Sequence, residues 1–175
     1  MIPAVMTTDT SPRNNRRLPL QPKPEAQKLF AAFQPIVEVA SGRISSYEAL
    51  ARQRDSRGTI RSAGGLFSDP AISNRRKRAF DHQVRRQALA RANQLPANTR
   101  MTLNISPQWI NDLEDGDVIP TLAMIHQAGV DPQRVVIELT ELSGDIDRIL
   151  AVVQRYRKAG LGVAIDDFGA GFSQL

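Results

Sequence analysis

The second half of the chain alternates short apolar runs with amphipathic stretches. Residues 101–107, 134–141 and 162–171 each contain a short apolar run, as expected of strands. Residues 121–130 and 143–160 instead repeat their apolar positions with helical spacing, and both end close to a glycine. Strands that alternate with helices in this way predict parallel strands joined by right-handed crossovers, which is an α/β architecture.

Two of the helices are predicted in more detail by their apolar side chains. In residues 75–95 an apolar residue recurs every four positions, which marks one buried face, and Pro96 lies just beyond the end. Ser143 is the expected N-cap of the helix in residues 143–160. The predicted buried face of the first helix is Phe80, Val84, Ala88 and Ala92, and that of the second is Ile146, Ile149, Leu150 and Val153.

The first half of the chain is less regular. Residues 1–28 are rich in proline and show no apolar period, so they predict a disordered leader, and residues 29–175 form the folded domain. Residues 33–50 predict two strands joined by a turn at Ser41-Gly42. Residues 53–74 predict no clear element, and the whole pattern predicts about five strands.

Composition narrows the class of protein. The chain has 175 residues, no cysteine and a net charge of +5. The lack of thiols excludes disulfides and thiolate metal sites, and no apolar run approaches the ~18 residues of a membrane span. These features predict a cytoplasmic globular protein. Basic residues concentrate in residues 1–30 and 75–78, but no stacking aromatic side chains interleave them, so nucleic-acid binding ranks last among the candidate functions.

Polar side chains follow the predicted strands at regular intervals. Asn104 and Glu138 are 34 residues apart, and Glu138 and Asp166 are 28 residues apart, each about one strand–helix unit. These residues therefore occupy equivalent C-terminal ends of successive parallel strands, which in a (β/α) barrel converge on one mouth. Glu48 closes another apolar run, in residues 47–50.

Carboxylates gathered at one mouth are costly unless a cation neutralises them. Carboxylate and amide oxygens are ligands that suit Mg²⁺ or Mn²⁺. In the adjacent pair Asp166-Asp167, one carboxylate could bridge two ions. Two such ions can clamp a phosphodiester and activate water. The glycine-bearing turn that follows would let the backbone approach a ligand. The alternative is that Glu138 and Asp166 only cap helix N-termini, and the spacing of the whole set favours the metal site.

Four sequence motifs match one family. The segment FQPIVEVASGRISSYEALAR, with EAL at 48–50, resembles the opening of an EAL domain, the bacterial cyclic di-GMP phosphodiesterase module. LNISP, IELTE and IDDFGAG resemble three later motifs of the family, in the same order. The resemblance covers about residues 29–175 and is poor between residues 54 and 78. It implies a modified TIM (β/α) barrel whose first strand runs antiparallel.

The resemblance also implies an activity and a set of site residues. EAL domains hydrolyse one phosphodiester of cyclic di-GMP to give linear pGpG, with two Mg²⁺ or Mn²⁺ ions. Gln34 and Arg52 would contact the dinucleotide, and the Arg52 guanidinium has the forked geometry that suits a phosphate. Glu141 would support the DDFG loop rather than bind metal. By motif position, the metal ligands would be Glu48, Asn104, Glu138, Asp166 and Asp167, with Asp167 holding the second ion.

The chain also departs from the family pattern. The later family motifs supply a catalytic lysine, a further metal-binding glutamate and a glutamine, and none has a counterpart before Leu175. A complete barrel of this kind has about 250 residues. The sequence therefore predicts an EAL domain that is truncated on its C-terminal side, has an open sheet edge, and is inactive or nearly so by itself.

Two functional hypotheses follow, and both name cyclic di-GMP as the small-molecule partner. In the first, the chain is the front part of a metal-dependent phosphodiesterase. In the second, it is a degenerate EAL protein that binds cyclic di-GMP or a protein partner without cleaving. An exposed sheet edge would then favour a homodimer or the docking of another protein.

Overall fold

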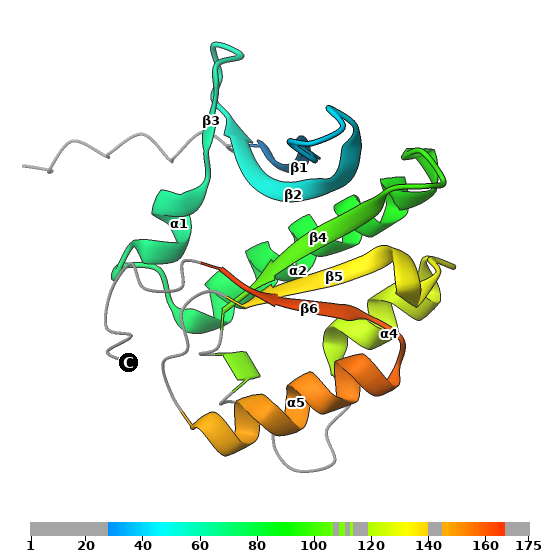
Figure 1. The fold of residues 1–175 in the computed structure, drawn as a ribbon. Helices are drawn as coiled ribbons and strands as arrows, with labels where there is room; N and C mark the ends of the chain where they lie inside the picture. Colours follow the sequence, from blue (N-terminus) through cyan, green and yellow to red (C-terminus); the bar gives the residue numbers. More distant parts are fainter. Residues whose placement is uncertain (1–27, 107–108, 111–112, 114–118, 140–144, 167–175) are drawn as a thin grey trace, which may run out of the picture.

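The computed structural model describes residues 28–106, 109–110, 113, 119–139 and 145–166. These residues form one six-stranded sheet with helices packed against it (Figure 1), which confirms the predicted α/β class. Most of the predicted leader and the predicted site residues Glu141 and Asp167 lie outside these ranges.

The sheet begins with an antiparallel pair. β1 (Lys28–Val37) runs antiparallel to β2 (Ile44–Arg54), as the family resemblance implies for the first strand. The predicted turn between them contains Gly42, whose φ of 68° is a left-handed conformation that a glycine adopts without steric cost. The short strand β3 (Ile60–Ser62) pairs with the other end of β2, also antiparallel.

The remaining strands are parallel, as the strand–helix alternation predicts. β4 (Arg100–Ile105) pairs with β2, β5 (Val135–Leu139) pairs with β4, and β6 (Gly162–Ile165) pairs with β5. The strand order is therefore β1-β2-β4-β5-β6, with β3 beside β2. β1 and β6 are the two edges of the described sheet.

Helices connect and cover these strands. They are α1 (Gly64–Ser68), α2 (Asn74–Arg91), the 3₁₀ turn η1 (Ala92–Gln94), α4 (Pro120–Gln127), the 3₁₀ turn η2 (Pro132–Arg134) and α5 (Ile146–Lys158). Figure 1 shows α2, α4 and α5 on the same side of the parallel strands. The three predicted helices are thus confirmed. None of the described helices is long and apolar enough to span a membrane.

One face of the sheet packs against the helices and the other carries polar side chains. In β5, Val135, Ile137 and Leu139 are buried, whereas Val136 and Glu138 between them are half-buried. This alternation follows from the pleat, which turns successive side chains to opposite faces. The residues of β4 that pair with the buried side chains of β5 are themselves buried. They are Met101, Leu103 and Ile105.

Two predictions about local structure need correction. Residues 53–74, for which the sequence predicts no element, contain β3 and α1, so the structure has one strand more than predicted. The helix predicted to start at Ser143 begins at Ile146, and its N-cap is Asp145. The Asp145 carboxylate accepts a hydrogen bond from the Arg148 backbone N–H at 3.2 Å. Aspartate is as favourable an N-cap as serine, so the prediction named the wrong one of two capping residues.

The buried face of α5 also differs from the prediction. Ile149 is buried and Val153 is half-buried as predicted, but Ile146 and Leu150 are 59% and 52% exposed. β6 is the last strand of the described sheet, so no further described strand lies beneath the part of α5 that extends past it. An apolar groove between α5 and β6 results. The side chains that α5 buries are Ile149, Val152 and Tyr156.

One arginine ties the start of β5 to the end of α2. The guanidinium of Arg134 donates hydrogen bonds to four backbone carbonyls at 3.1–3.4 Å, where the chain leaves α2 and leads into β4. Carbonyls at helix ends lack intrahelical donors, so a side chain that reaches them satisfies groups that would otherwise be costly. The acceptors are Ala92, Leu95, Pro96 and Thr99.

Replacing Arg134 by Met should destabilise the fold, because the variant keeps the aliphatic bulk but leaves four carbonyls without this donor. Hydrogen bonds to charged groups contribute about 1.5–3 kcal/mol, so we expect the free energy of unfolding to fall by about 2 kcal/mol in a urea titration. Arg43→Met, in the exposed turn after β1, should change little. Equal losses in the two variants would contradict this role.

Candidate metal centre

The polar face of the sheet carries the predicted site residues in adjacent rows. Strand register places Gln34 of β1 opposite Glu48 of β2, and Asn104 of β4 opposite Glu138 of β5. Glu48 also lies opposite Thr102, two residues before Asn104. Because opposed residues point to the same face of a sheet, these side chains from four strands project to the side away from the helices.

A side-chain hydrogen bond joins Asn104 to Glu48. The Asn104 Nδ2 donates to the Glu48 Oε1 at 2.8 Å, across 56 positions of the sequence. The other end of the same amide, Oδ1, is buried and has no hydrogen-bond partner among the residues that the structure describes. A buried acceptor without a donor is costly, and a cation would supply the partner that it lacks. The amide therefore fits a metal centre in which Asn104 contributes its oxygen.

Glu138 lies half-buried beside other carboxylates. Burial raises the pKa of Glu138 above its ordinary value of 4.5, and the negative charges of Glu48 and Asp166 raise it further. An interaction with the Thr102 hydroxyl lowers the pKa and opposes part of this shift. Glu48 and Asp166 are thus close enough for their charges to act on Glu138, and this repulsion favours a bound cation.

Asp166 is held at the end of the sheet by its backbone. Its N–H donates to the carbonyl oxygen of Leu139 at 2.9 Å, so pairing between the last two strands continues one residue beyond β6. The Asp166 side chain is exposed, beyond the end of β5. The roles predicted for Asp167 and Glu141 stay predictions, because both residues lie outside the described ranges.

Oxygen-bearing side chains from four parallel strands thus face one region. The four residues are Glu48, Asn104, Glu138 and Asp166. Carboxylate and amide oxygens are the ligands that Mg²⁺ and Mn²⁺ prefer. Within the part of the chain that the structure describes, no three Asp, Glu, His or Cys side chains form a complete metal-ligating group. The four side chains therefore face one region of the sheet without forming such a group among the described residues.

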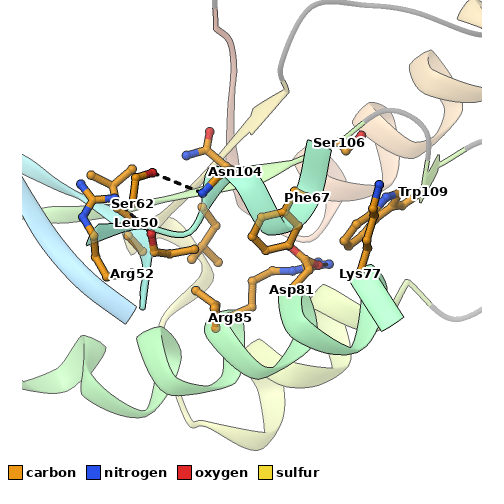
Figure 2. A pocket seen from close by; sticks show the side chains of 15 residues that line it. Leu50, Arg52, Ser62, Phe67, Lys77, Asp81, Arg85, Asn104, Ser106 and Trp109 are labelled. Atoms are coloured by element: carbon orange, nitrogen blue, oxygen red, sulfur yellow. Dashed lines mark hydrogen bonds and ion pairs between the residues drawn. The ribbon is translucent and has the colours of Figure 1, made fainter. Parts of the chain in front are cut away.

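The two residues predicted to contact substrate belong to β1 and β2. Gln34 is exposed, and Arg52 is half-buried with its guanidinium donating to the Ala51 carbonyl at 3.1 Å. Arg52 and Asn104 both line a pocket of about 370 Å³ between β2, β4 and α2 (Figure 2). The pocket thus connects a predicted phosphate-binding residue with a predicted metal ligand.

The same pocket contains a charged cluster that the sequence analysis missed. Lys77, Asp81 and Arg85 of α2 line it together with Trp109 (Figure 2). Arg85 is 5% exposed, forms an ion pair with Asp81 and donates to the hydroxyl of Thr121 in α4. Burial lowers the pKa of Arg85 to about 10, so it stays charged at neutral pH. The only signal in the sequence is the four-residue spacing of Asp81 and Arg85, which is typical of helix ion pairs.

The sequence of this domain matches one protein family along most of its length. The sequence model of the EAL domain matches residues 17–175. The chain belongs to the EAL domain family. The family predicted from the four motifs is therefore confirmed.

Other EAL proteins are much longer than this chain. An uncharacterized signaling protein of Caulobacter vibrioides is 32% identical over 153 residues, which are 85% of this EAL chain and 18% of that protein. The cyclic di-GMP phosphodiesterase PA2567 of Pseudomonas aeruginosa is 30% identical over 148 residues, which are 81% of this chain and 24% of that protein. The chain therefore corresponds to a minor part of each relative.

Two solved EAL structures share the fold. The YkuI protein of Bacillus subtilis, in complex with substrate c-di-GMP and calcium, matches with a TM-score of 0.73 and 26% identity over 84% of this chain and 37% of that chain. Klebsiella pneumoniae BlrP1, in a manganese and cyclic di-GMP complex, matches with a TM-score of 0.66 and 34% identity. The match covers 90% of this chain and 38% of that chain. The predicted barrel-type EAL fold is confirmed.

In metal-free protein, Glu138→Gln should raise thermal stability at pH 8. The pKa of Glu138 is raised in the folded state, so the folded protein holds this proton more tightly than the unfolded chain. Stability is therefore lost as the pH rises from about 4.5 through the folded-state pKa. Glutamine does not ionise and so removes this cost. In scanning calorimetry with chelator, the Tm of the variant should equal that of the parent near pH 4 and exceed it by a few degrees at pH 8.

Asp147→Asn, at an exposed carboxylate of α5 outside the site, is the matched control for removal of one negative charge. If Glu138→Gln were less stable than the parent at pH 8, the carboxylate would not be under the repulsion that the structure indicates.

Proposed function

We propose that this chain binds cyclic di-GMP through a divalent cation and contributes to an EAL domain that hydrolyses cyclic di-GMP to linear pGpG. The observation that carries the proposal is the hydrogen bond from Asn104 to Glu48, together with a buried amide oxygen in the row of Glu138 that has no partner in the described part of the chain. Relatives named as cyclic di-GMP phosphodiesterases, and solved neighbours that contain c-di-GMP with manganese or calcium, support the choice of substrate and cation.

The described side chains provide ligands for one cation, and the second depends on Asp167. The ligands of the first would be Glu48, Asn104, Glu138 and Asp166. We expect Mg²⁺ or Mn²⁺, because both prefer carboxylate and amide oxygens. When bound, the two ions would polarise the phosphate and lower the pKa of a bound water.

The chain's own residues would then hold the dinucleotide in place. The Arg52 guanidinium would donate two hydrogen bonds to a phosphate, and the Gln34 amide, opposite Glu48, would donate to a neighbouring oxygen. Glu141 would support the loop that carries Asp167. In the reaction, the water oxygen bonds to phosphorus and the bond from phosphorus to the ribose 3′ oxygen breaks. That oxygen leaves as a hydroxyl after it takes up a proton, and the product carries a 5′ phosphate.

The proposal extends to the cellular location and the partners of the protein. We place the protein in the cytoplasm, as the absence of thiols and of long apolar runs suggests. A homodimer or a protein partner would use the exposed apolar groove between α5 and β6. Isothermal titration measures whether the chain binds cyclic di-GMP, and chromatography of pGpG measures whether it cleaves it.

Binding of cyclic di-GMP should require both the cation and the Asn104 amide. In isothermal titration of the 175-residue chain with Mn²⁺ present, Asn104→Ala should weaken cyclic di-GMP binding at least tenfold, because the cation loses one ligand and Glu48 loses the group that orients it. Asn93→Ala, at an exposed asparagine of η1, is the control and should bind as the parent does. Binding that survives chelator and Asn104→Ala unchanged would refute the proposed site.

Hydrolysis by this chain alone should be slow or absent. The family's catalytic lysine and further metal-binding glutamate have no counterpart in these 175 residues, and loss of part of a site that works as a unit costs several orders of magnitude in rate. Chromatography of cyclic di-GMP incubated with the chain and Mn²⁺ or Mg²⁺ measures pGpG directly. Binding without turnover is the expected result, whereas metal-dependent turnover would contradict this prediction and show that the chain is itself a phosphodiesterase.

A further inference from the structure

The outer side of α5 and β6 carries a cluster of apolar side chains that are open to solvent. Ile146 and Leu150 of α5 and Ile165 of β6 are all exposed. Leu150 and Ile165 line the apolar groove between these elements, together with Val153 and Val163. A contiguous apolar surface of this kind, unlike a single exposed side chain, marks an interaction site.

The edge of β6 lies beside the same groove. β6 pairs with β5 along one side, and none of the described strands pairs with its other side. A free strand edge presents backbone N–H and C=O groups to which another strand can add. The occupant that suits this surface therefore supplies a strand to β6 and apolar side chains to α5.

The charges on α5 indicate which occupant fits. Asp147 lies in the first turn, Arg157 lies in the last turn, and both are exposed, with the apolar Leu150 between them. The other basic residues that could disturb this pattern are Arg148 and Arg155, and helical spacing turns them to the far side of the helix from Leu150. A helix that is acidic at one end and basic at the other is complementary to a copy of itself in the antiparallel direction.

We propose that a second copy of this chain covers the groove, related by a two-fold axis perpendicular to the sheet. This axis pairs the two β6 strands antiparallel and places the two α5 helices side by side and antiparallel, on one face of a continuous sheet. Val163 then lies opposite Ile165 of the partner subunit, because opposed residues share a face. The inference gives a geometry to the homodimer proposed above and does not depend on the cation or on cyclic di-GMP.

The spacing of strands and helices agrees with this arrangement. α5 lies over β5 and β6, whose Leu139 and Val163 line the groove with it. A copy of α5 on the other side of the axis is therefore about two strand spacings away. Two spacings of about 4.8 Å match the 8–10 Å that separates packed helices.

The same axis aligns the charges at the two ends of α5. Leu150 and Val153, near the middle of α5, line the groove with Ile165 of β6, so one axis can pass beside the middle of both elements. Asp147 and Arg157 lie five residues on either side of position 152. Antiparallel pairing about that position therefore brings each of them beside its opposite charge in the other copy, twice per dimer.

Two charge-reversed variants test the antiparallel arrangement. Asp147→Arg and Arg157→Glu each turn both pairs into like charges, so each variant alone should dimerise about tenfold more weakly than the parent. An equal mixture of the two variants restores opposite charges at both contacts, so the mixed dimer should form within about threefold of the parent affinity. The two positions are about 15 Å apart along one helix, so contacts within a monomer do not explain such a rescue.

The measurement is sedimentation equilibrium of the full 175-residue chain in chelator, from micromolar to millimolar concentration. The parent should approach twice its monomer mass of 19.3 kDa. Leu150→Glu should weaken the dimer by itself and should not be rescued by mixing. Arg91→Glu, at an exposed arginine in the last turn of α2, is the matched control and should dimerise as the parent does. Circular dichroism establishes that each variant is folded.

Two results would overturn the inference. One is a parent chain that remains monomeric over the whole range, and the other is a mixture of the charge-reversed variants that dimerises no better than either alone. Asp147 and Arg157 lie outside the candidate metal centre, so titration of the same variants with cyclic di-GMP and Mn²⁺ tests the proposed function separately. Failure to dimerise with cyclic di-GMP binding intact would leave the proposed function standing.

Discussion

Backbone hydrogen bonds hold β2, β4 and β5 in a parallel register, and the candidate site depends on that register. A shift of one residue would turn every side chain of a strand to the other face, because side chains alternate with a period of two. In the observed register Asn104 lies opposite Glu138 and Thr102 lies opposite Glu48, all on the face away from the helices. The same register buries Leu103 against the helices.

The site places negative charge where it is costly. Glu138 is half-buried and feels the charges of Glu48 and Asp166, and its raised pKa reports this cost. The described residues satisfy only part of the polar groups there, since the Asn104 amide donates to Glu48 but its oxygen has no partner among them. Such an imbalance is what the metal site that we propose would resolve.

Polar groups behind the sheet support this arrangement from the other side. Arg134 binds carbonyls at the end of α2 and so fixes the start of β5 relative to the chain that enters β4. Arg85, buried between Asp81 and Thr121, connects α2 to α4. These contacts join helices and strands that are distant in sequence.

The sequence by itself determined the alternation of strands and helices, the carboxylates near strand ends and the family, because each rests on local periodicity or on short motifs. Only the tertiary structure decided which side chains meet. The bond from Asn104 to Glu48, the position of Thr102 opposite Glu48 and the burial of Arg85 all depend on strand and helix pairing between distant segments. The exposure of Ile146 and Leu150 has the same origin, since helical spacing marks an apolar face but the neighbouring strand decides whether it is covered.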